Sequence, residues 1–263
     1  MELNLKVCQY RPVPADPERN SERIARELDS ECPDVLIFPE MFLTGYGKDC
    51  SSMDKKTGIA IKRIEEACRD TGKAAVFGGP CYEGEKIFNS LYFVTPDDTR
   101  VYRKIHLARF GVYSEDGFAS GSSPVIGEFR GVKFGLCICY DIFFPEVLRS
   151  CTLAGSVVNI CISASAWQSK TFLETVLPAR ALENVSYTVF ANNSGEMAGT
   201  LMFGGSRILS PFGDVMCSLD EGEGSCEATF SDVALSKFRN IRHHISDARK
   251  DIDWNDIESL ERY

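Results

Sequence analysis

Hydrophobic and polar positions follow two different periods along this chain, and the two periods predict strands and helices in alternation. The N-terminal segment LNLKVCQY alternates apolar and polar residues, as a half-buried strand does. Asp16 then provides an N-cap with Pro17 after it, and Ile24 and Leu28 follow at helical spacing. The chain is therefore expected to begin with a strand and a helix.

The alternation continues to the end of the chain. Strands are predicted for DVLIFPE, AAVFGGP, the hairpin NSLYFVT and RVYRK, VKFGLCICYD, SVVNICISAS, SYTVFANNSG, SRILSP, DVMCSL and CEATFSD. Helices are predicted over about 54–71 with Gly72 as the stop, from FPE at about 144–146, and over about 171–185. This order indicates an α/β protein whose sheets are covered by helices. No linker rich in Gly, Ser or Pro divides it, so residues 1–263 are expected to form one domain.

Composition and charge narrow the class of partner. Hydrophobic residues make up 44% of the chain and the formal net charge is -9, which argues against a surface that neutralises phosphates. No apolar run approaches the roughly 18 residues of a membrane helix, and the N-terminus does not resemble a signal peptide. The eleven cysteines are odd in number and scattered through apolar segments, as in a reduced cytoplasmic protein. We therefore expect a cytoplasmic protein with a small-molecule partner, and neither nucleic acid nor membrane.

Three polar residues stand where apolar strands run out. Glu40 follows VLIFP, Lys104 follows VYR, and Cys139 lies within GLCICYDIFFPE. Strand ends are where ligand sites gather in α/β sheets, so these residues are candidates for a shared site. Taken singly, each also has an ordinary structural explanation as a capping carboxylate, a solvated cation or a core thiol.

Together, FPE at Glu40, YRKIHL at Lys104 and GLCICYDIFFPE at Cys139 resemble the nitrilase superfamily of carbon–nitrogen hydrolases, whose catalytic Glu, Lys and Cys occur in this order. The resemblance extends through ARALENVSYTVFANNSG (179–195) and GGSRILSPFGDVM (204–216). It implies a four-layer α-β-β-α sandwich and an amidohydrolase that uses no cofactor and no metal.

The resemblance also implies a homodimer, or a higher homo-oligomer, with crossing C-terminal tails. In this chain the tail spans about 240–263 and mixes charge with aromatic surface, as an interface does. Its expected interface residues are Arg242, Arg249, Trp254 and Tyr263.

The chemistry gives each residue type a role. An amide carbon is a poor electrophile, and splitting the reaction through a thioester needs a thiolate at Cys139. Glu40 is expected to take the thiol proton and later activate water if burial raises its pKa. Lys104 and the backbone N–H of Tyr140 are expected to hold the oxyanion. The resemblance adds Glu115, in a segment one residue shorter than the usual pattern, as a second glutamate that positions Lys104 or the substrate.

Three other readings remain open. A papain-like thiol–imidazole pair would use His106, but that residue stands two positions after Lys104 and is interpreted as structural. A metal site would use Cys137 and Cys139 on one strand face, without the further ligands that zinc needs. A binding protein without activity is the third reading, because a fold does not guarantee a reaction.

The segment CYDIFF indicates the substrate class. Many relatives that act on carboxylate-bearing amides or N-carbamoyl amino acids have an Arg soon after the nucleophile, whereas this chain has Phe143 and Phe144. Phe offers no bidentate partner for a carboxylate. A small neutral or apolar amide is therefore expected, with Tyr46, Phe143 and Trp167 as pocket walls. A nitrile or an N-carbamoyl compound is the alternative substrate.

Overall fold

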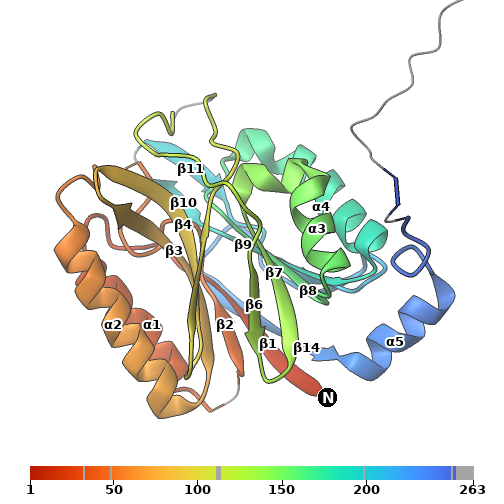
Figure 1. Cartoon of the computed structure of the whole chain (residues 1–263). Helices are drawn as coiled ribbons and strands as arrows, with labels where there is room; N and C mark the ends of the chain where they lie inside the picture. Colours follow the sequence, from red (N-terminus) through yellow and green to blue (C-terminus); the bar gives the residue numbers. More distant parts are fainter. Residues whose placement is uncertain (32, 48, 111–113, 198, 250, 253–263) are drawn as a thin grey trace, which may run out of the picture.

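Two six-stranded sheets lie face to face, with helices on their outer faces (Figure 1). The computed structural model describes residues 1–252 apart from 32, 48, 111–113, 198 and 250. Helices α1 (Pro17–Leu28) and α2 (Asp54–Thr71) cover one sheet, and α3 (Pro145–Leu153) and α4 (Lys170–Asn184) cover the other. The expected four-layer sandwich is confirmed.

The first sheet takes its strands from both ends of the described chain. Its order is β14 (Gly224–Ser231), β1 (Glu2–Gln9), β2 (Val35–Ile37), β3 (Ala74–Glu83), β4 (Lys86–Val94) and β5 (Thr99–Arg103). The β1–β2 and β2–β3 pairs are parallel, and the other pairs are antiparallel. The parallel pairs direct the ends of β2 and β3 to the same edge of the sheet.

The second sheet has a parallel centre as well. Its order is β13 (Val215–Ser218), β12 (Arg207–Leu209), β9 (Tyr187–Asn192), β8 (Val158–Ser163), β7 (Val132–Ile138) and β6 (Ile126–Phe129). The hairpin β10 (Ser194–Met197) and β11 (Thr200–Phe203) stands apart from both sheets. The carboxyl ends of β7, β8 and β9 meet at one edge.

Local chemistry explains where the helices begin and end. The Asp16 carboxylate accepts the N–H of Arg19 at 3.1 Å, and Pro17 occupies the first position of α1. Helix α2 stops at Gly72, whose φ of 68° closes the last turn. Both boundaries agree with the sequence expectation.

The apolar strands are buried on both faces. Between the sheets, Val7 and Val76 share a core cluster with Leu136 and Ile160. On the outer face of the first sheet, a second cluster packs α1 and α2 against that sheet. Burial on two sides explains why the central strands read as continuous hydrophobic runs.

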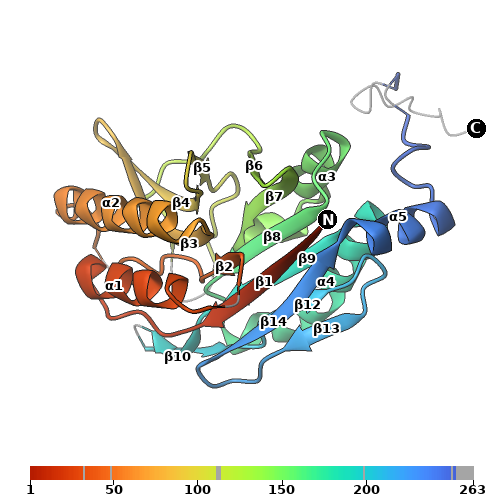
Figure 2. The ribbon, with the colours of Figure 1, turned by 90° about the horizontal axis from the view of Figure 1, so that it is seen from below.

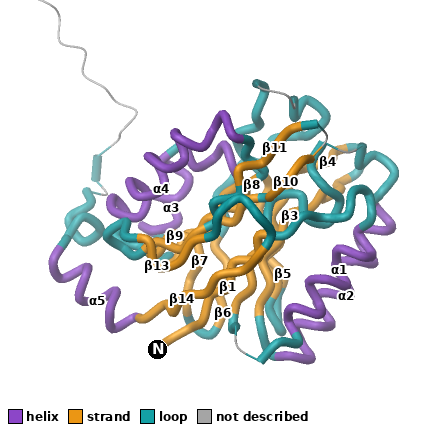
Figure 3. Tube along the Cα trace, turned by 180° about the vertical axis from the view of Figure 1, so that it is seen from behind, coloured by secondary structure: helices purple, strands orange, loops and turns teal. Residues whose placement is uncertain are grey.

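Strand β6, the hairpin of β10 and β11, and helix α5 (Asp232–Ile241) were not predicted as separate elements from the sequence. Helix α5 follows β14 at the edge of the sandwich (Figure 3). Beyond α5, Arg242 and Arg249 are exposed, whereas Trp254 and Tyr263 lie outside the described residues. The tail interface therefore stays a prediction. In the part of the chain that the structure describes, no helix combines the length and hydropathy that a membrane crossing requires.

Candidate active site

Two carboxylates and one ammonium group meet where β2 and β5 end. The Lys104 Nζ lies 2.9 Å from Glu40 Oε1 and 2.9 Å from Glu115 Oε2, and all three side chains are buried. Glu40 follows β2, Lys104 follows β5, and Glu115 comes from the loop beyond it. The structure thus brings together three residues that the sequence placed far apart.

Asn89 holds the two carboxylates at a fixed separation. Its Nδ2 donates to Glu40 Oε1 and to Glu115 Oε1, each at 2.7 Å. Asn89 lies on β4 and is fully buried. Asn89 was not predicted as a site residue from the sequence. The signal was available, because an Asn directly before the apolar run SLYFV needs hydrogen-bond partners for its side-chain amide when the strand is buried.

Glu40 is oriented from several directions. Its Oε2 accepts the backbone N–H of Ala164 at 2.7 Å, and its backbone carbonyl accepts from Asn193 Nδ2 at 2.9 Å. Burial raises the pKa of Glu40 above its ordinary value and repulsion from Glu115 adds to this, whereas Lys104 acts in the opposite direction. The carboxyl group therefore binds a proton more readily than an exposed glutamate does, as a group that takes up and releases a proton must.

Lys104 keeps its charge in this buried setting. Burial alone would lower the pKa of the ammonium group, but the attraction of Glu40, Cys139 and Glu115 outweighs it and holds the pKa well above the usual value. A cation fixed between two carboxylates is preorganised to stabilise negative charge that develops beside it.

Cys139 lies on a tight turn directly after β7. It is the first residue of a 3-10 helix, Cys139–Phe143, and has a φ of 47°, a conformation that is strained for a residue with a Cβ. Its half-buried Sγ lies 3.5 Å from Ser165 Oγ. The turn directs the thiol out of the strand ladder.

The resting thiol is protonated. Burial raises the pKa of Cys139 to about 12, and Glu40 adds to this by repulsion, whereas Lys104, Ser163 and Ser165 lower it. Lys104 therefore favours the thiolate, as expected, but its effect on the pKa is smaller than the opposite effect of burial. Any attack by this sulfur at neutral pH needs a base to remove its proton.

Cys137 and Cys139 do not form a pair on one strand face. Cys137 is the last residue but one of β7 and lies in the core opposite Cys161, while Cys139 belongs to the turn. The reading that placed both thiols on one strand is wrong because β7 ends at Ile138. Across the described ranges, no three His, Cys, Asp or Glu side chains are grouped to hold a metal ion.

Asp141 ties the segment of Lys104 to the segment of Cys139. Its Oδ2 accepts from the Tyr102 hydroxyl at 2.7 Å, and its Oδ1 accepts from the backbone N–H of His106 at 2.8 Å. Tyr102 and His106 stand two residues before and after Lys104, and Asp141 stands two residues after Cys139. One buried carboxylate therefore fixes both turns. Sequence reasoning missed it because its partners come from a distant segment.

His106 belongs to this support. Its Nδ1 lies 2.9 Å from Asp141 Oδ1, and its ring stacks on Phe144 with centroids 3.5 Å apart. These contacts favour the structural interpretation of His106 over a thiol–imidazole pair.

Replacing Asp141 with Asn is expected to lower kcat/KM by about 10²-fold, because small displacements of reacting groups have effects of that size. The amide nitrogen would face one of the donors that the carboxylate now accepts, which destabilises the fold by about 1–3 kcal/mol. Ammonia release and the rate of iodoacetamide labelling at Cys139 report on displacement of the reacting groups. The loss of folding stability is measured separately, by unfolding. A His106→Asn variant is the control and should retain activity within a few-fold; loss comparable to Asp141→Asn would restore imidazole chemistry as a candidate.

Gly78 lets β3 pass the Glu40 turn. A Cβ at this position would lie 2.2 Å from the Met41 backbone nitrogen and 2.7 Å from the Glu40 Cα. Gly78→Ala is therefore expected to displace Glu40 and to lower kcat/KM by about 10²-fold. Gly58→Ala is the control, because nothing lies within 4 Å of that added Cβ. Full activity of Gly78→Ala in a steady-state assay would show that the close approach of Gly78 to the Glu40 backbone is not required.

A cavity of about 460 Å³ opens over Cys139. Its described lining residues are Tyr46, Ala108, Phe110, Cys139, Tyr140, Phe143, Ala164, Ser165, Ala166, Gln168, Ser169, Phe172, Thr200 and Met202. They include no acidic or basic side chain. Three of the expected substrate contacts, Tyr46, Tyr140 and Phe143, are thus on the wall, and their binding role stays a prediction.

Trp167 is not among the described residues on this wall, in contrast to the expectation. Its half-buried side chain packs against the main core cluster, and Lys170 Nζ lies 4.5 Å from its ring centroid. The neighbours Ala166 and Gln168 reach the cavity instead. The short 3-10 turn Trp167–Ser169 therefore packs the half-buried aromatic residue against the core and presents its smaller neighbours to the cavity.

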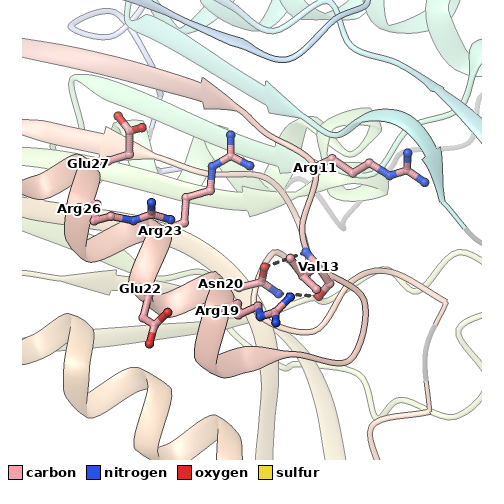
Figure 4. A pocket seen from close by; sticks show the side chains of 8 residues that line it. All are labelled: Arg11, Val13, Arg19, Asn20, Glu22, Arg23, Arg26 and Glu27. Atoms are coloured by element: carbon pink, nitrogen blue, oxygen red, sulfur yellow. Dashed lines mark hydrogen bonds between the residues drawn. The ribbon is translucent and has the colours of Figure 1, made fainter.

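A separate hollow of about 540 Å³ lies along α1 (Figure 4). It carries mixed charge: Arg23 approaches Glu223 at 3.3 Å, and Arg19 approaches Asp16 at 3.5 Å. It shares none of its described lining residues with the Cys139 cavity and contains no nucleophile. The candidate active site is therefore the cavity at Cys139.

The fold and this site define a class of hydrolase, and comparison with known proteins gives the family. The carbon-nitrogen hydrolase family model matches residues 5–241. The nitrilase of Pyrococcus abyssi (strain GE5 / Orsay) is 31% identical over 262 residues, which cover 95% of this chain and 97% of that protein. The chain belongs to the carbon-nitrogen hydrolase family, and it is an amidohydrolase acting on bonds other than peptide bonds.

Solved structures agree with this assignment. XC1258 from Xanthomonas campestris, described as a CN-hydrolase superfamily protein with an arsenic adduct in the active site, matches with a TM-score of 0.85 and 22% identity, covering 96% of this chain and 99% of that one. A variant of the Nesterenkonia AN1 amidase, from the nitrilase superfamily, matches with a TM-score of 0.80 and 25% identity, covering 93% and 96%.

Proposed function

We propose that this protein hydrolyses a small, neutral amide through a thioester at Cys139. The observation that carries the proposal is the cavity over that thiol, whose described walls are largely apolar and uncharged. Such a wall desolvates an apolar acyl group favourably, while an ionised group would lose its hydration without a partner.

Glu40 is the general base in this proposal. It takes the proton of Cys139 as the sulfur attacks the amide carbon, and it passes that proton to the departing ammonia or amine. It then removes a proton from the water that hydrolyses the thioester. A raised pKa for the Glu40 carboxyl, caused first by burial, suits both directions of proton transfer.

Lys104 and the backbone N–H of Tyr140 stabilise the oxyanion of each tetrahedral intermediate. Glu115 holds the ammonium group through its 2.9 Å ion pair and itself accepts the backbone N–H of Ala108 at 2.6 Å. We assign Glu115 a positioning role, because its fixed carboxylate keeps Lys104 directed at the reacting atoms.

Amides, N-carbamoyl compounds and nitriles compared at equal concentration, with ammonia release as the readout, test the proposal. Small aliphatic amides are expected to react fastest, and an amide with a distal carboxylate to react much more slowly. Turnover of nitriles alone would overturn the amidase proposal in favour of a nitrilase, the activity named for the Pyrococcus abyssi relative. Preference for N-carbamoyl compounds would overturn the substrate class.

We propose one domain, a cytoplasmic location and a homodimer, the last because the family resemblance implies one and the outer helices carry exposed apolar residues such as Phe172 and Leu182. Light scattering at micromolar concentration tests the dimer, and a monomer there would contradict it.

A further inference from the structure

Two thiols face each other where the edges of the two sheets meet. Strand β14 is the edge of the first sheet and β13 is the edge of the second, and the two strands run beside each other (Figure 2). Cys217 on β13 and Cys226 on β14 place their sulfur atoms 2.9 Å apart. The pair therefore bridges two sheets that no backbone ladder joins at this edge in the described residues.

The pair differs from the other cysteines in its surroundings. Both residues are half-buried, whereas Cys8, Cys68, Cys137 and Cys161 are fully buried. Each is held in register by its own sheet, Cys217 opposite Ile208 and Cys226 opposite Val7. Neither lines the cavity over Cys139. The two thiols thus form a separate, accessible and preorganised group.

We propose that Cys217 and Cys226 are a redox-active thiol pair that forms a reversible disulfide joining the two sheets. The co-reactant is a low-molecular-weight disulfide such as oxidised glutathione. In a reducing compartment such bonds are transient and respond to the redox poise, which fits a regulated bond rather than a permanent one.

The exchange proceeds in two balanced steps. Cys217 loses its proton and its thiolate attacks one sulfur of the small disulfide, so that a mixed disulfide forms and a small thiolate leaves and takes up a proton. Cys226 then loses its proton and attacks the Cys217 sulfur, and the second small thiolate leaves and is protonated. Two protein thiols are oxidised and one small disulfide is reduced to two thiols.

The order of attack follows from the local electrostatics. The contact between the two sulfur atoms lowers the pKa of Cys217 and outweighs the opposite effect of burial. The same contact and burial raise the pKa of Cys226. Cys217 is therefore the first nucleophile and Cys226 the resolving thiol.

A disulfide here should stabilise the fold. It closes the loop between two consecutive strands, β13 and β14, that belong to different sheets, and cross-links that restrict the unfolded chain raise the melting temperature. We expect a rise of several degrees in oxidised glutathione, reversed by dithiothreitol.

Peptide mapping tests the proposal in a Cys139→Ala background, which removes the proposed nucleophile as a competing site of oxidation. After oxidised glutathione, alkylation of free thiols and digestion, we expect a 217–226 cross-linked peptide. Cys217→Ser and Cys226→Ser should each abolish the peptide and the melting shift, whereas Cys81→Ser, another half-buried cysteine, should preserve both. Scattered glutathionylation without the cross-link, or a melting shift that survives in Cys217→Ser, would overturn it. Neither readout depends on turnover, so failure here leaves the proposed reaction untouched.

Discussion

Cys139→Ala is expected to reduce ammonia release from the best substrate by at least about 10⁴-fold, the loss typical when a covalent nucleophile is removed. The cavity, the oxyanion donors and Glu40 would remain, so substrate binding should persist while the thioester cannot form. Steady-state ammonia release measures the loss. Mass spectrometry of the wild-type protein during turnover should show an acyl adduct on the Cys139 peptide, and the variant should show none.

A matched control separates lost chemistry from lost structure. Cys81 is also half-buried, lies on β3 and does not line the cavity, so Cys81→Ala should retain activity. Both variants should unfold near the wild-type temperature. Substantial turnover in Cys139→Ala would assign the chemistry to another group and remove the thioester from the mechanism.

The protonation state of the Cys139 thiol distinguishes this site from that of a thiol hydrolase with an imidazole base. With a pKa of about 12 for Cys139, the sulfur is not a standing thiolate, unlike the thiol of an imidazole-paired enzyme. Deprotonation must then accompany attack, and Glu40, whose charge raises the pKa of the Cys139 thiol and which pairs with Lys104 at 2.9 Å, is the base that we propose.

The sequence predicted those parts of the fold that depend on local chemistry. Helix α1 has its Asp16 cap and α2 has its Gly72 stop, so the start of α1 and both ends of α2 were predicted correctly. Helix α5 was not predicted, although the Ser231 side chain caps it by accepting the Ala234 N–H at 3.4 Å. The helix is short and its cap is the last residue of strand β14, so no loop separates the two elements. Strand β6 was missed because it is only four residues long.

The site divides in the same way. Glu40, Lys104 and Cys139 each lie in a recognisable sequence motif. The order of the three motifs along the chain supported the family resemblance. Asn89 and Asp141 act through partners from other strands, so only the folded chain identifies them. Trp167 was expected on the cavity wall because aromatic residues line pockets, but the turn Trp167–Ser169 packs its half-buried ring against the core.

The single substitution Lys104→Met is expected both to remove activity and to destabilise the fold. The variant leaves Glu40 and Glu115 buried without their shared cation, and breaking a buried ion pair costs about 3–5 kcal/mol. The pKa of Glu40, already raised by burial, would rise further without the ammonium group. A larger fraction of Glu40 would then carry a proton and be unable to accept one, and the oxyanion would lose a donor, so kcat/KM should fall by at least about 10³-fold.

The pH dependence of stability identifies the cause. A carboxyl group whose folded pKa is raised destabilises the protein fully above that pKa, and the penalty disappears as pH falls from there to the ordinary pKa of a glutamate. The deficit of Lys104→Met should therefore be larger at neutral pH than at acidic pH. Lys6→Met is the matched control: Lys6 is largely buried, pairs with Glu27 at 3.0 Å and lies outside the cavity. It should retain activity and lose less stability. A deficit of Lys104→Met that did not change between neutral and acidic pH would show that lost packing, rather than two unpaired carboxylates, is responsible.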